Sequence, residues 1–164
     1  MPLSWNEIRH RAIAFSKEWT SEKREQAEKH TFWNQFFDVF GVSRRAVASF
    51  EEPVRSLSGT YKRIDLLWPG IVLVEHKSRG KDLGKAESQA FRYIQDLARE
   101  RRDKEIPRYI IVSDFARISC QSETANNDSV MWYGSAQWRQ RRPKIISISR
   151  PSVHAGVLLR TSTA

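Results

Sequence analysis

The chain has 164 residues, a length that fits one folded domain with a single hydrophobic core. It carries 28 Lys and Arg against 19 Asp and Glu, and the net charge of +9 favours a polyanionic partner such as DNA or RNA, although solubility alone also explains it. No stretch approaches the ~18 apolar residues of a membrane span. The single cysteine, Cys120, excludes a disulfide framework and a cysteine-rich zinc site. Because the first residues lack the apolar stretch of a secretory signal, we expect a cytoplasmic protein without membrane contact.

Two helices are predicted in the first 41 residues. Ser4 and Glu7 fit a capping box at the start of the first helix. Its apolar residues recur at helical spacing: Trp5, Ile8, Ala12, Phe15 and Trp19. The second helix is predicted from about residue 21 through the aromatic run TFWNQFFDVFG, which ends at Gly41, a natural helix stop. One aromatic stripe in this helix recurs every four residues and is expected in the core: Phe32, Phe36 and Phe40.

Strands are predicted after a short basic segment. The segments PVRSL and YKRIDLLW precede the turn residues Pro69 and Gly70, and IVLVEHK follows them. A helical period returns from Asp82 to about Arg101, and RYIIVSDF is an apolar run typical of a buried strand. The order of helix, helix, three strands, helix and strand predicts an α/β domain. Its crossover helix indicates a mixed central sheet flanked by helices.

The character of the chain changes after about residue 118. The last acidic residue is Asp128, Ser is frequent, and hydrophobic periodicity is poor. We therefore predict a folded domain over residues 1–118 and a basic, Ser-rich tail over residues 119–164. The tail is a basic DNA-contacting arm, a disordered segment or the product of a shifted reading frame, and the missing periodicity favours the last two. Without a further strand after Asp114, the sheet would keep an exposed edge.

Two acids and a lysine interrupt the predicted apolar hairpin. If the hairpin turns at Gly70, Asp65 and Glu75 are each five residues from its centre and face each other on neighbouring strands. Strand alternation then places Lys77 on the face of Glu75 and the side chain of His76 on the other face. Opposed carboxylates repel each other, and a divalent cation such as Mg²⁺ or Mn²⁺ would remove the repulsion. A lysine beside them could orient the attacking water or steady charge on a phosphate.

The same spacing also fits a solvated sheet face, on which Asp65 and Glu75 would form casual ion pairs with Arg63 and Lys77. The apolar neighbours of the two acids favour a partly enclosed site instead: Ile64, Leu66, Leu73 and Val74.

These residues also carry a family resemblance. Asp65, followed after nine residues by Glu75-His76-Lys77, resembles the D…ExK signature of the PD-(D/E)XK nuclease superfamily. The segment QAFRY, with Gln89 and Tyr93 on one helix face, resembles the Q-x3-Y motif of the RecB-like branch. A longer ordered set, from about residue 5 to 118, is similar to the N-terminal domain of MmeI-like restriction–modification enzymes and related DNA methyltransferases. Its segments are WNEIRHRAIAFSKEW, FWNQFFDVFGV, FEEPV, RIDLLWPGIVLVEHKSRGKDL, QAFRYIQDL and PRYIIVSDF.

The resemblance implies a restriction-endonuclease-like fold and Mg²⁺-dependent hydrolysis of double-stranded DNA that leaves 5′-phosphate ends. Asp65 and Glu75 would hold the metal, the carbonyl of His76 could add a ligand, and Lys77 would serve the attacking water. An acid on the first core helix often completes the site in this superfamily. Glu28 is the candidate for that acid and Glu25 its competitor, while a surface salt bridge is the alternative for either.

The resemblance also implies residues that contact DNA. Gln89 and Tyr93 would contact DNA or support the active site. Arg79 and Lys81 lie in the loop after the predicted site and suit a phosphate groove, although a solvated loop fits equally well.

The chain lacks two features of these relatives, namely a Gly-rich loop for S-adenosylmethionine and an N-P-P-Y or D-P-P-Y methylation motif. We therefore expect either a fragment of a truncated gene or a nuclease domain that works beside a separate methyltransferase and target-recognition subunit. A non-catalytic DNA-binding or assembly module is the alternative. The presence of Asp65, Glu75 and Lys77 together favours the nuclease.

Overall fold

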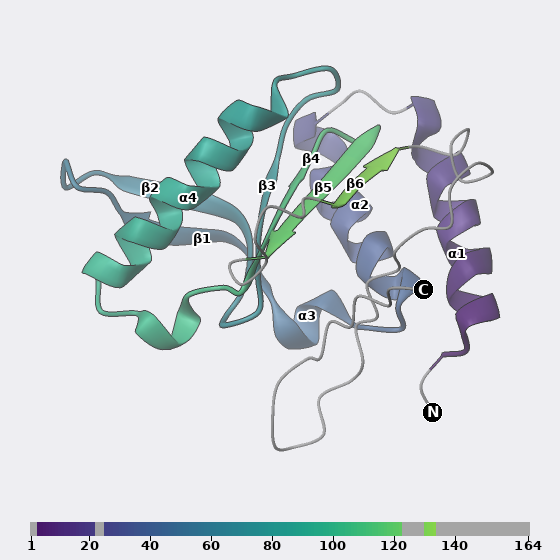
Figure 1. Cartoon of the computed structure of the whole chain (residues 1–164), viewed down its shortest axis with the longest axis horizontal. Coiled ribbons are helices and arrows are strands. Elements are labelled where there is room, and N and C mark those ends of the chain that lie inside the picture. The colour runs from purple at the N-terminus through teal and green to yellow at the C-terminus, as the bar shows by residue number, and fades with distance from the viewer. Residues whose placement is uncertain (1–2, 22–24, 123–129, 134–164) are drawn as a thin grey trace.

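The computed structural model describes residues 3–21, 25–122 and 130–133, and its centre is a six-stranded mixed sheet in which the strands follow one another in chain order (Figure 1). The strands β1 (Ser49–Arg55), β2 (Tyr61–Trp68) and β3 (Val72–His76) are antiparallel neighbours. Helix α4 (Leu83–Arg99) then crosses over to β4 (Tyr109–Ser113), which is parallel to β3. The strands β5 (Arg117–Ser122) and β6 (Val130–Tyr133) extend the sheet in antiparallel fashion.

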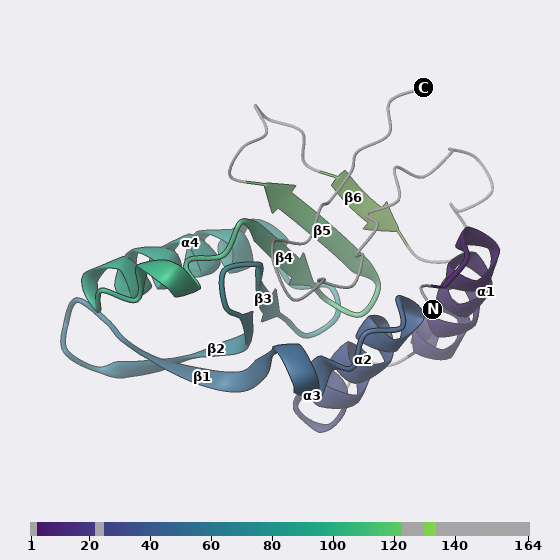
Figure 2. The ribbon, with the colours of Figure 1, turned by 90° about the horizontal axis from the view of Figure 1, so that it is seen from below.

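Helices cover both faces of this sheet (Figure 2). Helix α4 packs on one face, and the N-terminal helices α1 (Trp5–Glu18), α2 (Glu25–Val39) and α3 (Arg44–Val47) lie on the other. Two 3₁₀ turns, Trp19–Ser21 and Asp103–Glu105, complete the described elements. The predicted architecture, a mixed central sheet flanked by helices, is confirmed. No helix in the described part of the chain is long and apolar enough to cross a membrane.

The predicted ends of the helices follow from local side-chain chemistry. The hydroxyl of Ser4 accepts a hydrogen bond from the backbone N–H of Glu7, which caps the start of α1 as expected. The carboxylate of Asp82 accepts from the N–H of Gly84 and caps α4 in the same way. Helix α2 is followed by Gly41 at a φ of 70°, a left-handed conformation that glycine adopts without steric cost.

The turn between β2 and β3 sets the register of the hairpin. Pro69 and Gly70 occupy its two central positions, and the N–H of Ile71 donates to the carbonyl of Trp68 at 3.0 Å. Gly70 has a φ of 71°, as a type II turn requires at its third position. The turn pairs Trp68 with Val72, and the register then continues along both strands.

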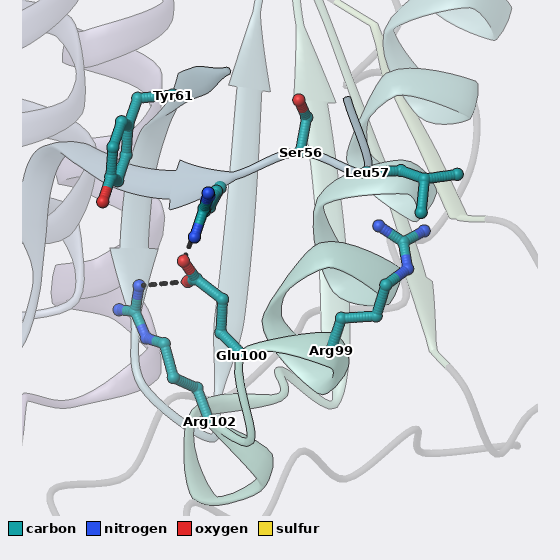
Figure 3. A pocket seen from close by; sticks show the side chains of 7 residues that line it. Ser56, Leu57, Tyr61, Arg99, Glu100 and Arg102 are labelled. Carbon is teal, nitrogen blue, oxygen red and sulfur yellow. Dashed lines mark hydrogen bonds and ion pairs between the residues drawn. The ribbon is translucent and has the colours of Figure 1, made fainter. Parts of the chain in front are cut away.

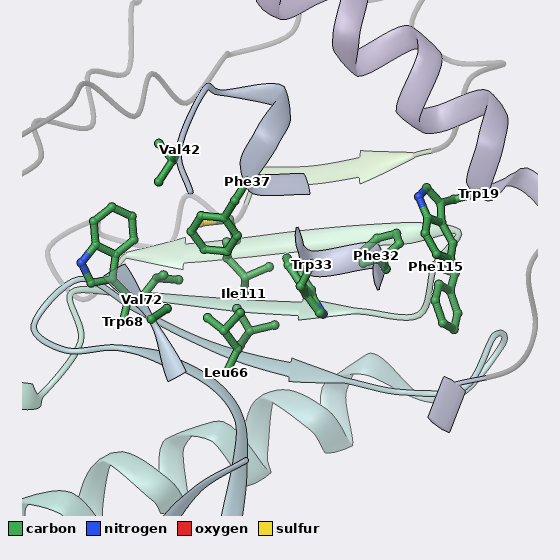
Figure 4. Close-up of a cluster of buried hydrophobic side chains, with 13 residues drawn as sticks. Trp19, Phe32, Trp33, Phe37, Val42, Leu66, Trp68, Val72, Ile111 and Phe115 are labelled. Carbon is green, nitrogen blue, oxygen red and sulfur yellow. The ribbon is translucent and has the colours of Figure 1, made fainter. Parts of the chain in front are cut away.

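Two hydrophobic clusters hold the sheet between its helices. The cluster under α1 and α2 is aromatic and is built around Trp33 and Phe32, both completely buried (Figure 4). The cluster under α4 is mostly aliphatic and includes Leu73, Leu97 and Ile64 beside Tyr93. Phe36 and Phe40 from the predicted stripe are only partly buried, because Trp33 and Phe37 occupy the inner positions of α2.

The strands β5 and β6 correct the prediction for the end of the domain. β5 runs across the boundary at residues 118 and 119, where the tail was expected to begin, and pairs with every residue of β4. The sheet therefore does not end after Asp114. The alternation in RISCQS was missed because small polar residues replace the Val, Ile and aromatic residues that mark a strand. The predictions for the tail otherwise fall on residues 123–129 and 134–164, which lie outside the described residues.

Candidate active site

The predicted pairing of the two acids follows from the observed register. β2 and β3 pair Leu66 with Val74, so the next position along the same register places Asp65 opposite Glu75. The regular ladder ends at Leu66–Val74, and the backbone N–H of His76 donates instead to Asp65 Oδ2 at 2.7 Å. The Asp65 carboxylate thus takes the place of the ladder partner that this N–H would otherwise need.

Glu75 is the most deeply buried acid of the site, with 3 % of its side chain exposed. Burial, followed by the negative charge of Asp65, raises the pKa of Glu75 to about 7, and the nearby ammonium of Lys77 only partly offsets this. Glu75 Oε1 accepts a hydrogen bond from Lys77 Nζ at 2.6 Å. Glu75 Oε2 is buried and has no hydrogen-bond partner among the described residues. A buried carboxylate oxygen without a donor is costly unless a cation or a water molecule satisfies it.

Lys77 links the acids to helix α4. Its ammonium donates to Glu75 and, at 3.0 Å, to Gln89 Oε1. Because lysine can only donate, Gln89 must present its oxygen, which leaves its amide nitrogen to donate to the Tyr93 hydroxyl at 2.7 Å. Burial raises the pKa of Tyr93 to about 12, so this hydroxyl remains protonated at neutral pH. The structure therefore brings the predicted pair Gln89 and Tyr93 to the lysine, as support for it.

The side chain of His76 points away from this cluster, as strand alternation predicted. Its imidazole lies among Phe32, Trp33 and Phe115, and both ring nitrogens lack a partner among the described residues. Burial, and then the charge of Lys29, lower the pKa of His76 to about 3, which keeps the ring neutral. The ring is a core group, so only the backbone carbonyl of His76 remains a candidate ligand.

The loop between β3 and α4 is fastened to the corner after β4. The buried carboxylate of Asp114 accepts from the N–H of Gly80 at 3.0 Å and from the side chain of Arg117. Arg117 also donates to the carbonyl of Lys81 at 2.9 Å. Arg79 in the same loop donates to the carbonyl of Trp19. The predicted phosphate-contacting residues Arg79 and Lys81 thus lie on a loop that these hydrogen bonds position next to Lys77.

Helix α2 brings to Asp65 a residue that the sequence did not suggest. Lys29 Nζ donates to Asp65 Oδ1 at 2.7 Å and to Glu51 Oε1 at 2.6 Å. Glu28, the predicted acid of this helix, is partly buried beside Lys29, and its catalytic role stays a prediction. The side chain of its competitor Glu25 lies outside the described residues. The available signal for Lys29 was its spacing of three and four residues from Phe32 and Trp33, which places it on the core-facing side of α2.

The donor set at this site suits a hard cation. In the part of the chain that the structure describes, no three or more His, Cys, Asp or Glu side chains gather closely enough to hold a metal ion. A cation would therefore rest on the two carboxylates of Asp65 and Glu75, with the His76 carbonyl or water as further oxygens. The unsatisfied Glu75 Oε2 and the two opposed acids fit the oxygen ligands that Mg²⁺ and Mn²⁺ prefer.

A cavity of about 590 Å³ opens elsewhere, between the β1–β2 hairpin and the end of α4 (Figure 3). Glu100 lies within it, accepting from the backbone N–H of Arg55 and pairing with Arg102. None of the lining residues belongs to the acidic cluster: Arg55, Ser56, Leu57, Tyr61, Arg99, Glu100 and Arg102.

Comparison with known proteins places the chain in a family. The family model described as MmeI, N-terminal domain, matches residues 10–151. The chain belongs to the MmeI N-terminal domain family. The match extends beyond residue 118 and includes β5 and β6, so the family domain is longer than the folded region that the sequence predicted.

The chain is also similar to part of a larger protein of known structure. A cryo-EM structure of a DrdV–DNA complex is similar to the chain with a TM-score of 0.45 and 13% sequence identity. The similarity covers 77% of this chain and 12% of that one, so the chain spans a small part of that protein's length. No curated protein sequence matches the chain. The resemblance to the MmeI N-terminal domain, read from the ordered segments of the sequence, is confirmed by the family match.

Proposed function

We propose that this MmeI N-terminal domain is a divalent-cation-dependent DNA endonuclease domain of a restriction–modification system. The observation that most supports the proposal is the buried Glu75, which lies opposite Asp65, contacts Lys77 and keeps one carboxylate oxygen unsatisfied within the described structure. An unsatisfied buried carboxylate oxygen lowers stability in a purely structural role, whereas it offers a ligand where a cation binds. The products would be 5′-phosphate ends.

In this proposal Asp65 and Glu75 hold Mg²⁺ or Mn²⁺, with the His76 carbonyl as a candidate third ligand. The bound cation would supply electrophilic stabilisation of the phosphate and of the attacking oxygen. The N–H of His76 donates to Asp65 Oδ2 and so fixes the orientation of the Asp65 carboxylate before a cation binds. Cation binding would also favour the ionised form of Glu75, whose pKa is about 7 in the protein alone.

Lys77 is the residue proposed to act on the water and the phosphate. Its backbone N–H is fixed by the carbonyl of Ser113 at 2.8 Å, and its ammonium is fixed by Glu75 and Gln89. A lysine held in this way can orient the attacking water and stabilise negative charge that develops on the phosphate. Tyr93 holds the Gln89 amide in the orientation that Lys77 requires.

The DNA backbone would lie over the loop that follows Lys77. Arg79 and Lys81 are the residues proposed to contact phosphates there, and the net charge of +9 suits a polyanion. Phosphate contacts give no sequence specificity by themselves. A methyltransferase and target-recognition subunit is therefore the proposed partner that would select the site and protect the host DNA.

Plasmid nicking and linearisation in Mg²⁺ and in Mn²⁺ test this proposal, together with calorimetric titration of Mn²⁺ into the metal-stripped protein. Asp65→Ala should lose both cleavage and Mn²⁺ binding. Lys77→Ala should lose cleavage but keep most of its DNA affinity, because one lost lysine removes about one phosphate contact. Lys104→Ala is the matched control, since Lys104 is an exposed lysine in the 3₁₀ turn after α4.

Two outcomes would overturn the proposal. A folded wild-type protein that neither binds Mn²⁺ nor cuts would exclude a cation site. Cation binding through Asp65 without any cleavage would replace the nuclease with a non-catalytic DNA-binding or assembly module, which was the alternative from the sequence.

A further inference from the structure

Three acids lie in register across three neighbouring strands. β1 and β2 pair Phe50 with Leu66 and Glu52 with Ile64, so Glu51 occupies the position opposite Asp65. β2 and β3 place Asp65 opposite Glu75 in turn. Like charges at opposed positions of paired strands are destabilising, and the row Glu51–Asp65–Glu75 contains two such neighbours. The fold must therefore supply positive charge along this row even before a cation binds.

Lys29 supplies that charge between Glu51 and Asp65. Its ammonium donates to both carboxylates, at 2.6 and 2.7 Å, and only 13 % of the side chain is exposed. Burial alone would lower the pKa of Lys29, but the hydrogen bonds to Asp65 and Glu51 outweigh it and raise the pKa overall. Lys29 is therefore a charged group held in place between two acids.

Glu51 adopts an unusual backbone conformation at this position. Its φ is 53°, in the left-handed region, although the residue lies inside strand β1 and carries a side chain. Such a conformation is strained for a residue with a side chain and persists where the surrounding structure enforces it. Its side chain contacts Lys29 and lies 3.8 Å from His30 Nε2. The strained backbone thus accompanies a carboxylate that anchors the lysine.

We propose that Lys29, anchored by Glu51, is a positioning residue and built-in counter-ion for Asp65 that sets the affinity of the site for its cation. The inference rests on the proposed function, because it assumes that Asp65 is a cation ligand. The ammonium fixes Asp65 Oδ1 while the site is empty of cation, and its positive charge opposes an incoming divalent ion. Glu51 acts in the opposite sense, since it shares the ammonium with Asp65 and adds negative charge nearby.

The direction in which two substitutions change the affinity for Mn²⁺ distinguishes this role from ordinary structural support. Lys29→Met keeps an unbranched side chain one atom shorter and removes its charge, so Mn²⁺ should bind about tenfold more tightly. Glu51→Gln should weaken Mn²⁺ binding by a similar factor. The double variant should return close to the wild-type affinity, because the two charges cancel. If Lys29 only supported the fold, both single variants would weaken binding.

The experiment is calorimetric titration of Mn²⁺ into the metal-stripped full chain, with thermal unfolding measured in EDTA and in Mn²⁺. Lys29→Met should unfold at a lower temperature than wild type in EDTA and gain more from Mn²⁺, because the stabilisation that a ligand gives grows with its affinity. Lys29→Arg keeps the charge and should restore wild-type behaviour. Lys104→Met is the control for loss of an exposed lysine. Lys29→Gln serves as the uncharged variant if Lys29→Met does not fold.

Failure of this inference and failure of the proposed function give different results. Unchanged or weaker Mn²⁺ binding by the folded uncharged Lys29 variant, in a protein whose binding still depends on Asp65, would overturn the role of Lys29 alone. Mn²⁺ binding that Asp65→Ala leaves intact would overturn the proposed cation site itself.

Discussion

Replacing Glu75 by glutamine removes a buried charge while keeping the shape of the side chain and an oxygen that can accept from Lys77. The pKa of Glu75 is raised from 4.5 to about 7, so the folded protein binds this proton more tightly than the unfolded chain does. The stabilising contribution of Glu75 is therefore fully present below about pH 4.5 and is lost as the pH rises through about 7. Because a glutamine side chain does not titrate, the Glu75→Gln variant should escape this loss.

The size of this pH-dependent loss of stability follows from the pKa shift of Glu75. One pKa unit corresponds to about 1.4 kcal/mol, so the wild type should lose about 2–3 kcal/mol of unfolding free energy relative to Glu75→Gln between about pH 4.5 and pH 8. For a domain of this size, that difference corresponds to roughly 5–10 °C in Tm. Glu75→Gln should therefore be clearly more stable at pH 8 and much closer to wild type at pH 5.

Thermal unfolding followed by circular dichroism, in EDTA at several values between pH 5 and pH 8, measures this difference directly. Glu7→Gln is the matched control, because Glu7 is half exposed and pairs with Arg11 on the surface of α1. Its Tm difference from wild type should stay nearly constant over the same range. A Tm difference between Glu75→Gln and wild type that does not grow with pH would refute the burial and charge coupling inferred for Glu75.

Three further substitutions test the fold around the site. Phe32→Ala empties a fully buried position in the aromatic cluster and should lower the free energy of unfolding by about 3–5 kcal/mol in urea titrations. Burial alone would raise the pKa of Asp114, but hydrogen bonds from Arg117 and Gly80 lower it overall. Asp114→Asn should therefore destabilise the protein at neutral pH, by about 1–3 kcal/mol in the same titrations, and progressively less as the pH falls below 4. Tyr93→Phe removes the hydroxyl that holds Gln89 and should slow cleavage severalfold while changing Tm little, as nicking rates and thermal unfolding would show.

The sequence predicted the geometry of the hairpin because local chemistry determines it. Pro69 and Gly70 define the turn, and with the turn in place the register of both strands follows from counting residues. The opposition of Asp65 and Glu75 and the contact between Glu75 and Lys77 needed no information from elsewhere in the chain.

The contributions from distant segments were not predictable in this way. Lys29 reaches Asp65 across 36 positions in the chain, and nothing local to α2 marks it as a partner of β2. Glu51 was missed for a simpler reason, since the first strand was predicted to begin at Pro53 and in fact begins at Ser49. Proline usually stands at the edge or the first position of a strand, which made the later start the natural prediction.

The acidic row is balanced by groups that belong to separate parts of the fold. Lys29 from α2 donates to Asp65 and Glu51. Lys77, which directly follows β3, donates to Glu75 and to Gln89 of α4. A buried ion pair of this kind adds little net stability compared with apolar residues of similar size. The two residues that flank Asp65 and the two that precede Glu75 are buried and apolar: Ile64, Leu66, Leu73 and Val74. The charges of Asp65 and Glu75 therefore oppose the apolar packing of β2 and β3. Proteins place charges against packing in this way mainly where they bind or react, so the stability lost to the acidic row is itself an argument for a functional site.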